Sequence, residues 1–244
     1  MADLFDTIGL DDTDLRRADP RIAAAVRAAL GPAKTVINVG AGAGAYEPGG
    51  LAVTAVEPSA ERVRQRPATR PAAVVRGMAE ALPFRDNTFD AAMAVLTVHH
   101  WHDQARGLAE LRRVARGKVV ILTIDPAFRD FWLYDYVPGL VDLDAAQMPP
   151  LDVFRRALGP VEITPVPIPH DCTDGFLAAY WRRPAAYLDP RVRAAMSSLP
   201  ALGDITPALD RLKADLASGA WEKAHGAVLG ADTLDCGYRL VVSR

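Results

Sequence analysis

The chain has little of what several specialised protein classes require. It has only two cysteines among its 244 residues, Cys172 and Cys236, far apart and in no spacing typical of a zinc site. We therefore expect no disulfide framework and no bound metal. A basic surplus is also missing, because 28 Lys and Arg residues face 30 Asp and Glu residues. Nucleic-acid-binding proteins usually carry such a surplus, so a nucleic-acid partner is not expected.

Long apolar runs are absent as well. No run reaches the roughly 18 residues that a membrane-spanning helix needs. Residues 1–6 show no basic stretch followed by an apolar one, so no signal peptide is expected. The hydrophobic fraction of 50% and the charged fraction of 24% are ordinary for a globular protein. We expect a single cytoplasmic domain over residues 1–244 that does not contact membranes. The sequence does not predict its oligomeric state.

What the first half does contain is a series of short apolar runs, each closed by turn residues. They cover 35–39, 51–56, 72–75, 91–96 and 118–124. Such runs, without alternation of polar and apolar residues, are typical of strands covered on both faces, as in a parallel sheet. Helical spacing appears at 20–30 and again after Asp103. Alternating strands and helices over 20–125 predict an α/β doubly wound, Rossmann-like core.

The second half is less regular. Residues 161–169 indicate a strand interrupted by prolines, and 233–242 a last strand. Helices are expected around 174–198 and 206–218. Aromatic residues gather between 128 and 136, directly after the fifth apolar run. Because ligands bind outside the carboxyl ends of strands in open α/β sheets, we expect 127–150 and 170–230 to form a helical lid over that edge.

The most informative stretch is Val36 to Gly44, where a strand ends in a glycine-rich loop. Glycines at this point let the backbone turn sharply and approach a ligand where a Cβ atom would collide. Glu57 ends the next strand, 17 residues after Gly40. A carboxylate there can accept hydrogen bonds from both hydroxyls of a ribose. Together, the glycine-rich loop and Glu57 indicate a cofactor that contains adenosine.

The loop alone does not decide which cofactor this is. Gly40, Gly42 and Ala45 also fit the looser dinucleotide pattern, so a Rossmann-type NAD-dependent oxidoreductase is one alternative. Against it, only residues 40–51 separate the two strands, which leaves barely one helical turn to bind a pyrophosphate. None of the four lysines follows a tyrosine by four residues, the spacing used by short-chain reductases. A structural turn, or a cofactor-binding protein without turnover, also stays open.

Four motifs in order resemble the class I S-adenosylmethionine-dependent methyltransferases, in the small-molecule group that includes the ubiquinone/menaquinone-type enzymes. They are 36–44, the acidic Glu57 with Pro58, the segment 77–90, and 96–101. The resemblance implies a seven-stranded, mostly parallel sheet with an antiparallel last strand. It also implies S-adenosyl-L-methionine as the cofactor and a small molecule as the methyl acceptor. The implied cofactor-binding residues are Asn38, Gly40, Ala41, Gly42, Gly44, Glu57, Pro58, Gly77, Met78, Ala79, Glu80 and Leu96.

Three features depart from the family pattern. Asn38 stands where the family often has an acidic residue, so it brings no negative charge to the cofactor's ammonium group. Met78 replaces the aspartate that commonly takes the adenine amino group. The connection over 40–51 is too short for a full helix. Each departure predicts weaker cofactor binding unless other residues compensate.

The catalytic and acceptor-binding residues are expected around the carboxyl edge. Methyl transfer needs alignment first, and a base only when the acceptor must lose a proton. His99 and His100 are the candidate bases, although packing of the loop and lining of the pocket is the favoured explanation for them. Arg16, Arg17 and Arg21 either pair with the cofactor's carboxylate or lie in solvent. The expected acceptor-binding residues are Trp101, Phe128, Trp132, Tyr136 and His170.

Overall fold

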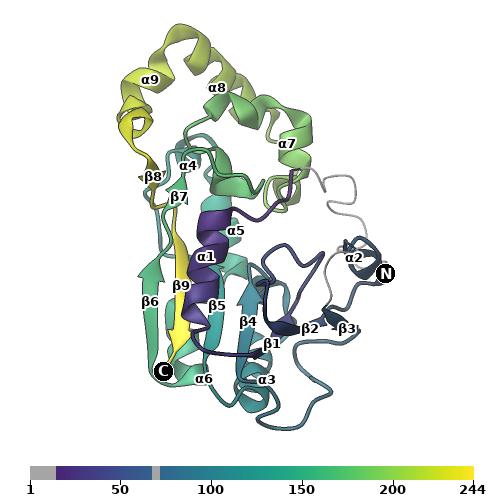
Figure 1. Cartoon of the computed structure of the whole chain (residues 1–244). Coiled ribbons are helices and arrows are strands. Elements are labelled where there is room, and N and C mark those ends of the chain that lie inside the picture. The colour runs from purple at the N-terminus through teal and green to yellow at the C-terminus, as the bar shows by residue number, and fades with distance from the viewer. Residues whose placement is uncertain (1–14, 68–71) are drawn as a thin grey trace.

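The computed structural model describes residues 15–67 and 72–244, and residues 1–6, where no signal peptide is expected, lie outside that range. Within it, one mixed sheet has the strand order β3-β2-β1-β4-β5-β9-β6 (Figure 1). Its strands are β1 (Thr35–Val39), β2 (Ala52–Val56), β3 (Ala73–Val75), β4 (Ala91–Val95), β5 (Val119–Ile124), β6 (Val161–Pro165) and β9 (Tyr238–Ser243). The first five strands pair in parallel, and β9 is antiparallel to both β5 and β6. This confirms the expected seven-stranded sheet with an antiparallel last strand.

The central strands are apolar throughout because both of their faces are covered. Val36 and Met93 face one hydrophobic cluster, whereas their neighbours Ile37 and Ala92 face another. The first cluster includes α1 (Pro20–Ala29), and the second includes α3 (Gln104–Val114) and α6 (Leu151–Leu158). Successive strand side chains point to opposite faces, so a strand between two helical layers needs apolar residues at every position.

Side-chain caps set the starts of the helices on both faces. Asp19 accepts a hydrogen bond from the backbone N–H of Arg21 at the start of α1. Asp103 does the same for Arg106 in α3, as the sequence predicts. Ser59 caps α2 (Ala60–Arg64). These bonds satisfy N–H groups that have no partner inside the helix, and they fix where each loop meets its helix.

The last strand differs from the prediction. Residues 233–242 are not one strand, because the chain breaks at Asp235, whose carboxylate accepts a bond from the N–H of Gly237. The short β8 (Thr233–Leu234) pairs instead with β7 (Ile168–Pro169), in a separate two-stranded ribbon. β9 then enters the main sheet. An Asp side chain can bond to a nearby backbone N–H and form a turn where the backbone would otherwise continue a strand. The pattern of apolar residues does not predict such a turn.

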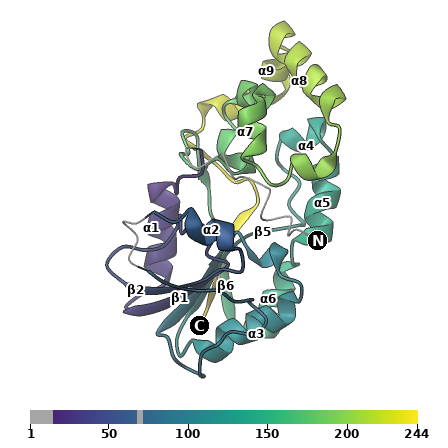
Figure 2. The same ribbon diagram turned by 90° about the vertical axis from the view of Figure 1, so that its right-hand side faces the viewer.

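The remaining helices gather above the carboxyl edge of the sheet (Figures 1 and 2). They are α4 (Leu133–Tyr136), α5 (Gly139–Gln147), α7 (Pro190–Ala194), α8 (Thr206–Ser218) and α9 (Ala220–His225). The helical stretch expected around 174–198 is divided into short 3-10 turns and the five-residue helix α7, since Pro184 and Pro190 each start a new element. We call residues 125–150 and 166–234 the cover. Its buried side chains join the cluster of α1, so it shares a core with the sheet.

None of the helices in the described part of the chain is long and apolar enough to cross a membrane.

Candidate active site

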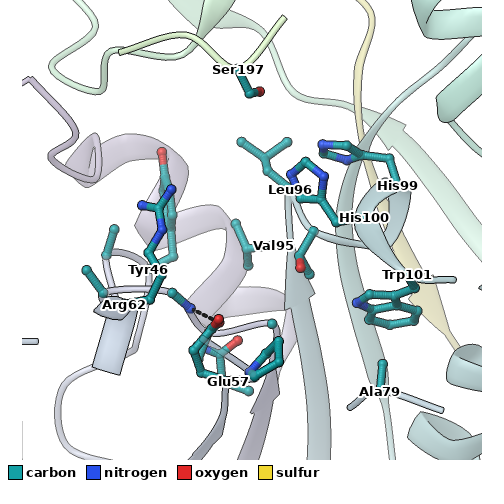
Figure 3. Close-up of a pocket in the computed structure, with 18 of the residues that line it drawn as sticks. Tyr46, Glu57, Arg62, Ala79, Val95, Leu96, His99, His100, Trp101 and Ser197 are labelled. Atoms are coloured by element: carbon teal, nitrogen blue, oxygen red, sulfur yellow. Dashed lines mark hydrogen bonds between the residues drawn. The ribbon is translucent and has the colours of Figure 1, made fainter. Parts of the chain in front are cut away.

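A cavity of about 280 Å³ separates the sheet edge from the cover (Figure 3). Its floor consists of the loops that follow β1, β2, β3 and β4. Its roof comes from the cover, including Met148, Phe176, Leu177, Ser197 and Ser198. The carboxyl ends of parallel strands meet at one edge, so residues far apart in sequence converge there.

The glycine-rich loop is held by its backbone. The N–H groups of Gly40 and Ala41 both donate to the carbonyl of Val56 in β2, at 2.9 and 3.1 Å. Gly40 has a φ of +70°, and a Cβ atom there would lie 2.0 Å from Oγ1 of Thr97. Gly40 is therefore required by close packing between the β1 and β4 loops. Gly42 instead has open space on its Cβ side, at the cavity wall.

Glu57 ties two floor loops together. One carboxylate oxygen accepts a 2.7 Å bond from the N–H of Gly42, drawn in Figure 3, and the other accepts a 3.0 Å bond from Ser59. The side chain lines the cavity although only 6% of the residue is exposed. Each carboxylate oxygen has a further lone pair. The geometry leaves Glu57 able to accept hydrogen bonds from a bound diol.

A buried ion pair underlies the glycine-rich loop, and we call it the loop clamp. Nη2 of Arg66 lies 2.6 Å from Oε1 of Glu47, with side chains only 6% and 5% exposed. Nη1 of Arg66 donates to the carbonyl of Gly42 at 3.1 Å, and Asn38 donates to Glu47 at 3.2 Å. Gly44 packs on this pair and does not line the cavity.

The clamp explains two departures found in the sequence. The connection over 40–51 forms turns and no helix, so hydrogen bonds from Arg66 fix a loop that a helix would otherwise fix. The amide at Asn38 can donate to Glu47, which a carboxylate at that position could not do. Asn38 is therefore part of the clamp, and an amide at this position fits the carboxylate of Glu47 beside it.

The loop after β3 lines the end of the cavity next to Glu57. Gly77, Met78, Ala79 and Glu80 all border it, and Met78 is 41% exposed. Oε1 of Glu80 accepts a 3.2 Å bond from the N–H of Asp103. This bond joins the β3 loop to the β4 loop. Met78 thus gives this end of the cavity an exposed apolar side chain.

The loop after β4 carries the two histidines. Leu96 has a φ of +50°, a conformation that costs energy for a residue with a side chain and that is often found at functional sites. A 3-10 turn (Val98–His100) follows and brings both imidazoles to the cavity wall, with ring centroids 3.8 Å apart. Trp101 packs over Gly107 of α3. In Figure 3 its indole lies below the histidines, on the side where Ala79 is drawn.

Burial keeps both imidazoles neutral. Desolvation, followed by repulsion from His100, lowers the pKa of His99 to about 3. Desolvation, followed by the nearby Arg62, lowers the pKa of His100 to about 4. Neutral imidazole is the form that accepts a proton, so both rings are in the basic form at pH 7.

The structure does not bring four of the expected acceptor-binding residues to the cavity. Trp132 is buried and donates to the carbonyl of Trp181 at 2.8 Å, deep in the cover. The hydroxyl of Tyr136 donates to Asp215. Phe128 lies under the guanidinium of Arg239. His170 is held near the carbonyl of Asp232 on the outside. The aromatic cluster packs the cover because strand-end position alone does not fix where side chains point.

Three further residues border the cavity, and of these only Arg16 had been considered from the sequence, as a partner for the cofactor's carboxylate. Arg16 and Tyr46 border it, and both bond to the buried Asp174 of the cover, at 2.8 and 2.7 Å. Arg62 also borders it. Its position on the helix after Glu57 is a signal that sequence reasoning could have used. The bonds from Arg16 and Tyr46 to Asp174 could not be predicted in this way, because they join residues more than 120 positions apart in the sequence.

Within the described residues, no group of three or more His, Cys, Asp or Glu side chains has a metal-binding arrangement.

Comparisons with known proteins agree with this geometry. A family model described as "Methyltransferase domain" matches residues 37–122, which begin within β1, end within β5 and include most of the cavity floor. The crystal structure of a putative methyltransferase from an antibiotic biosynthesis pathway of Anabaena variabilis superposes with a TM-score of 0.87. It is 34% identical in sequence, and the match covers 95% of this chain and 100% of that one.

Curated relatives match over shorter segments. The Escherichia coli protein YafE, described as uncharacterized, is 38% identical over 63 residues, which cover 24% of this chain and 30% of that protein. The rice chloroplast 2-methyl-6-phytyl-1,4-hydroquinone methyltransferase 2 is 30% identical over 97 residues, covering 40% and 28%. The chain thus spans less than a third of the length of either relative. With the full-length match to the Anabaena variabilis structure, the findings show that this chain belongs to the class I S-adenosylmethionine-dependent methyltransferases.

Proposed function

We propose that this chain transfers a methyl group from S-adenosyl-L-methionine to a small-molecule acceptor held between the sheet edge and the cover. The observation that carries the proposal is the position of Glu57. Its buried carboxylate borders the cavity, is braced by two backbone N–H groups, and lies beside the open face of Gly42. This combination suits the ribose of an adenosine.

The cavity floor fits the rest of the cofactor. Adenine would pack on Pro58, Met78 and Ala79, with backbone groups of this loop as hydrogen-bond partners. Asn38 gives its amide N–H to Glu47, which leaves its carbonyl oxygen as an acceptor for the cofactor's ammonium group. The other proposed cofactor contacts are Gly40, Ala41, Gly77, Glu80 and Leu96, all of which border the cavity. Gly44 is proposed to support the glycine-rich loop indirectly, because it packs on the loop clamp and does not border the cavity.

The roof and the β4 loop would position the acceptor. When bound, the cofactor supplies a methyl group on a positively charged sulfur, which is already a good leaving group. The side chains of the chain therefore gain most by aligning the acceptor and excluding water. His99 and His100 are neutral, and their pKa values of about 3 and 4 make them weak bases, so they are proposed to position the acceptor more than to take its proton. Trp101, on the side of Ala79, is proposed to border the adenosine rather than the acceptor.

A nicotinamide enzyme is a poorer fit. Residues 40–51, all of them described, contain turns but no helix whose N-terminus could hold a pyrophosphate. A protein that binds the cofactor without turnover has the same floor as an enzyme, so only activity separates the two.

The test is a transfer assay with methyl-labelled S-adenosylmethionine and a broad panel of phenols, quinols, amines and carboxylic acids. We expect label in at least one acceptor and stoichiometric S-adenosylhomocysteine. Firm cofactor binding without transfer to any class would favour the non-catalytic alternative. The matched control is Glu57→Ala, which should lower transfer by impairing cofactor binding.

A further inference from the structure

We propose that Glu47 and Arg66 of the loop clamp are positioning residues for cofactor recognition. They hold the amide of Asn38 in the one orientation that selects a cofactor with an amino group. The inference rests on the proposed function, because it concerns the cofactor in the same cavity. Both Glu47 and Arg66 are described, and neither borders the cavity, so they act on the cofactor through Asn38.

The order of the strands places Asn38 under the amino-acid part of the cofactor. Along the carboxyl edge the strands follow one another as β3, β2, β1 and β4. Met78 lies after β3 at the proposed adenine site, and Glu57 lies after β2 at the proposed ribose site. In the cofactor, the sulfur and the amino-acid chain follow the ribose. A molecule laid along the edge in this order brings that chain over the end of β1, where Asn38 borders the cavity.

The hydrogen bond to Glu47 fixes the orientation of the Asn38 amide. Nδ2 of Asn38 donates to Oε1 of Glu47 at 3.2 Å, and Asn38 is only 4% exposed. A carboxylate accepts hydrogen bonds and cannot donate them. Turning the amide over would therefore place its carbonyl oxygen against Glu47 with no hydrogen between the two oxygens. The N–H group stays on the side of Glu47, and the carbonyl oxygen is the part of the amide that a ligand can use.

Arg66 keeps Glu47 in the form and place that this orientation requires. Its Nη2 lies 2.6 Å from Oε1 of Glu47, and its Nη1 donates to the carbonyl of Gly42 at 3.1 Å. A buried carboxylate without a cation is unfavourable, and Arg66 supplies the cation. Because Arg66 also bonds to the glycine-rich loop, it holds Glu47 in a constant position relative to the cavity floor.

An acceptor fixed at the cavity wall favours a ligand that brings a donor. The protonated amino group of the cofactor carries three N–H groups and no acceptor, so it can donate to the carbonyl oxygen of Asn38. A ligand without that amino group would cover this oxygen without giving it a partner, which weakens binding. We therefore expect the site to distinguish S-adenosylhomocysteine from its deaminated analogue.

The test compares S-adenosylhomocysteine with the analogue in which a hydrogen replaces the amino group, each titrated calorimetrically into the protein. The measured quantity is the selectivity, which is the Kd of the analogue divided by the Kd of S-adenosylhomocysteine. A role of the clamp in stability alone would change both Kd values together and leave the selectivity unchanged. We expect a selectivity of at least about tenfold for the wild type, the worth of a hydrogen bond to a charged group.

The variant Glu47→Leu with Arg66→Met removes the acceptor beside Asn38, so the amide can turn and the selectivity should fall below about threefold. In Glu47→Gln with Arg66→Met, the carbonyl of the glutamine can still accept, and part of the selectivity should remain. Asp152→Asn with Arg156→Met is the matched control. It removes an ion pair of α6 whose side chains are 55% and 67% exposed, and it should keep the selectivity of the wild type.

Asn38→Ala retains the pair of Glu47 and Arg66 but should lose the selectivity. If Glu47→Leu with Arg66→Met does not fold, the glutamine variant decides, because its selectivity must lie at least about twofold below that of the wild type.

A wild-type selectivity near one overturns the proposal. Full selectivity in the clamp variants also overturns it, because Asn38 would then need no positioning. Failure of the proposed function would look different, since the wild-type protein would bind neither S-adenosylhomocysteine nor its deaminated analogue.

Discussion

The floor and the roof of the cavity are built by different means. In the floor, the hydrogen bonds go to backbone groups of neighbouring loops: Gly40 and Ala41 bond to the carbonyl of Val56, and Gly42 bonds to the side chains of Glu57 and Arg66. The roof is fixed by side chains from distant segments, such as Asp174 with Arg16. A site made of backbone contacts tolerates few residue types, whereas one made of side chains can be rebuilt by substitution. This difference explains why motifs identify the cofactor and leave the acceptor open.

The largest effect should come from breaking the loop clamp under the floor. Arg66→Met leaves the carboxylate of Glu47 buried without its cation, because both side chains are nearly inaccessible. Removing one partner of such a pair costs about 3–5 kcal/mol of the free energy of unfolding. Urea unfolding measures this cost. The double variant Glu47→Gln with Arg66→Met should regain much of the loss, and no regain would show that the pair is not the cause.

The next largest effect should come from disturbing the close packing of Gly40 in the floor. Gly40→Ala combines a strained φ of +70° with a Cβ atom 2.0 Å from Thr97. Gly31→Ala has a similar φ of +62° but nothing within 4 Å, so it measures strain alone. We expect Gly40→Ala to be less stable than Gly31→Ala by about 1–3 kcal/mol and to lose cofactor binding. Equal stabilities of the two variants would contradict the packing argument.

Removing a side-chain contact in the roof should weaken cofactor binding less than a change in the floor does. Asp174→Asn removes the charge that Arg16 pairs with but leaves an oxygen for the Tyr46 hydroxyl. We expect a loss of about 1–3 kcal/mol in the free energy of unfolding, with the Kd for S-adenosylhomocysteine changed by only a few-fold. Calorimetric titration gives the second value. A loss of cofactor binding as large as in Gly40→Ala would mean that floor and roof are not independent.

The smallest effect concerns the two histidines. Their pKa values of about 3 and 4 in the folded protein lie below the usual 6.5, so unfolding takes up protons between these values. Stability should therefore fall as the pH drops from about 6.5 toward 4. The double variant His99→Gln with His100→Gln should lose less Tm over this interval than the wild type.

The same variants probe catalysis. If the histidines only line the cavity, His100→Gln should change kcat by less than about tenfold and keep the pH profile between pH 6 and 8. A general base would cost roughly 10²–10⁴-fold. We expect the smaller change, because the pKa of His100 is far below neutral, which makes its imidazole a weak base.

Much of the floor could be predicted from the sequence. The apolar runs that become β1, β2 and β4 end at the cavity, and Glu57 lies there as expected. Local signals were sufficient because each loop follows directly from its strand. The absence of a helix over 40–51 was also readable from its length, although the loop clamp was not. Nothing in the sequence pairs Glu47 with Arg66 across 19 positions.

The cover could not be predicted in the same detail. Its aromatic residues 128–136 were expected over the cavity but fill its own core, with Trp132 surrounded by other rings. Apolar character shows that a side chain will be buried and not which surface it will meet. The turn at Asp235, which divides the last strand, is likewise set by one hydrogen bond. Tertiary contacts decide these positions.

The most direct test of the account is a calorimetric titration of S-adenosylhomocysteine into the wild-type protein and Glu57→Ala. The central claim is that Glu57, braced by Gly42 and Ser59, holds the cofactor's ribose. We predict clear binding to the wild type, weakened by about 1.5–3 kcal/mol in Glu57→Ala, with no effect of Glu162→Ala at the exposed face of β6. Binding of NADH without binding of S-adenosylhomocysteine, or equal affinity of the wild type and Glu57→Ala, would contradict it.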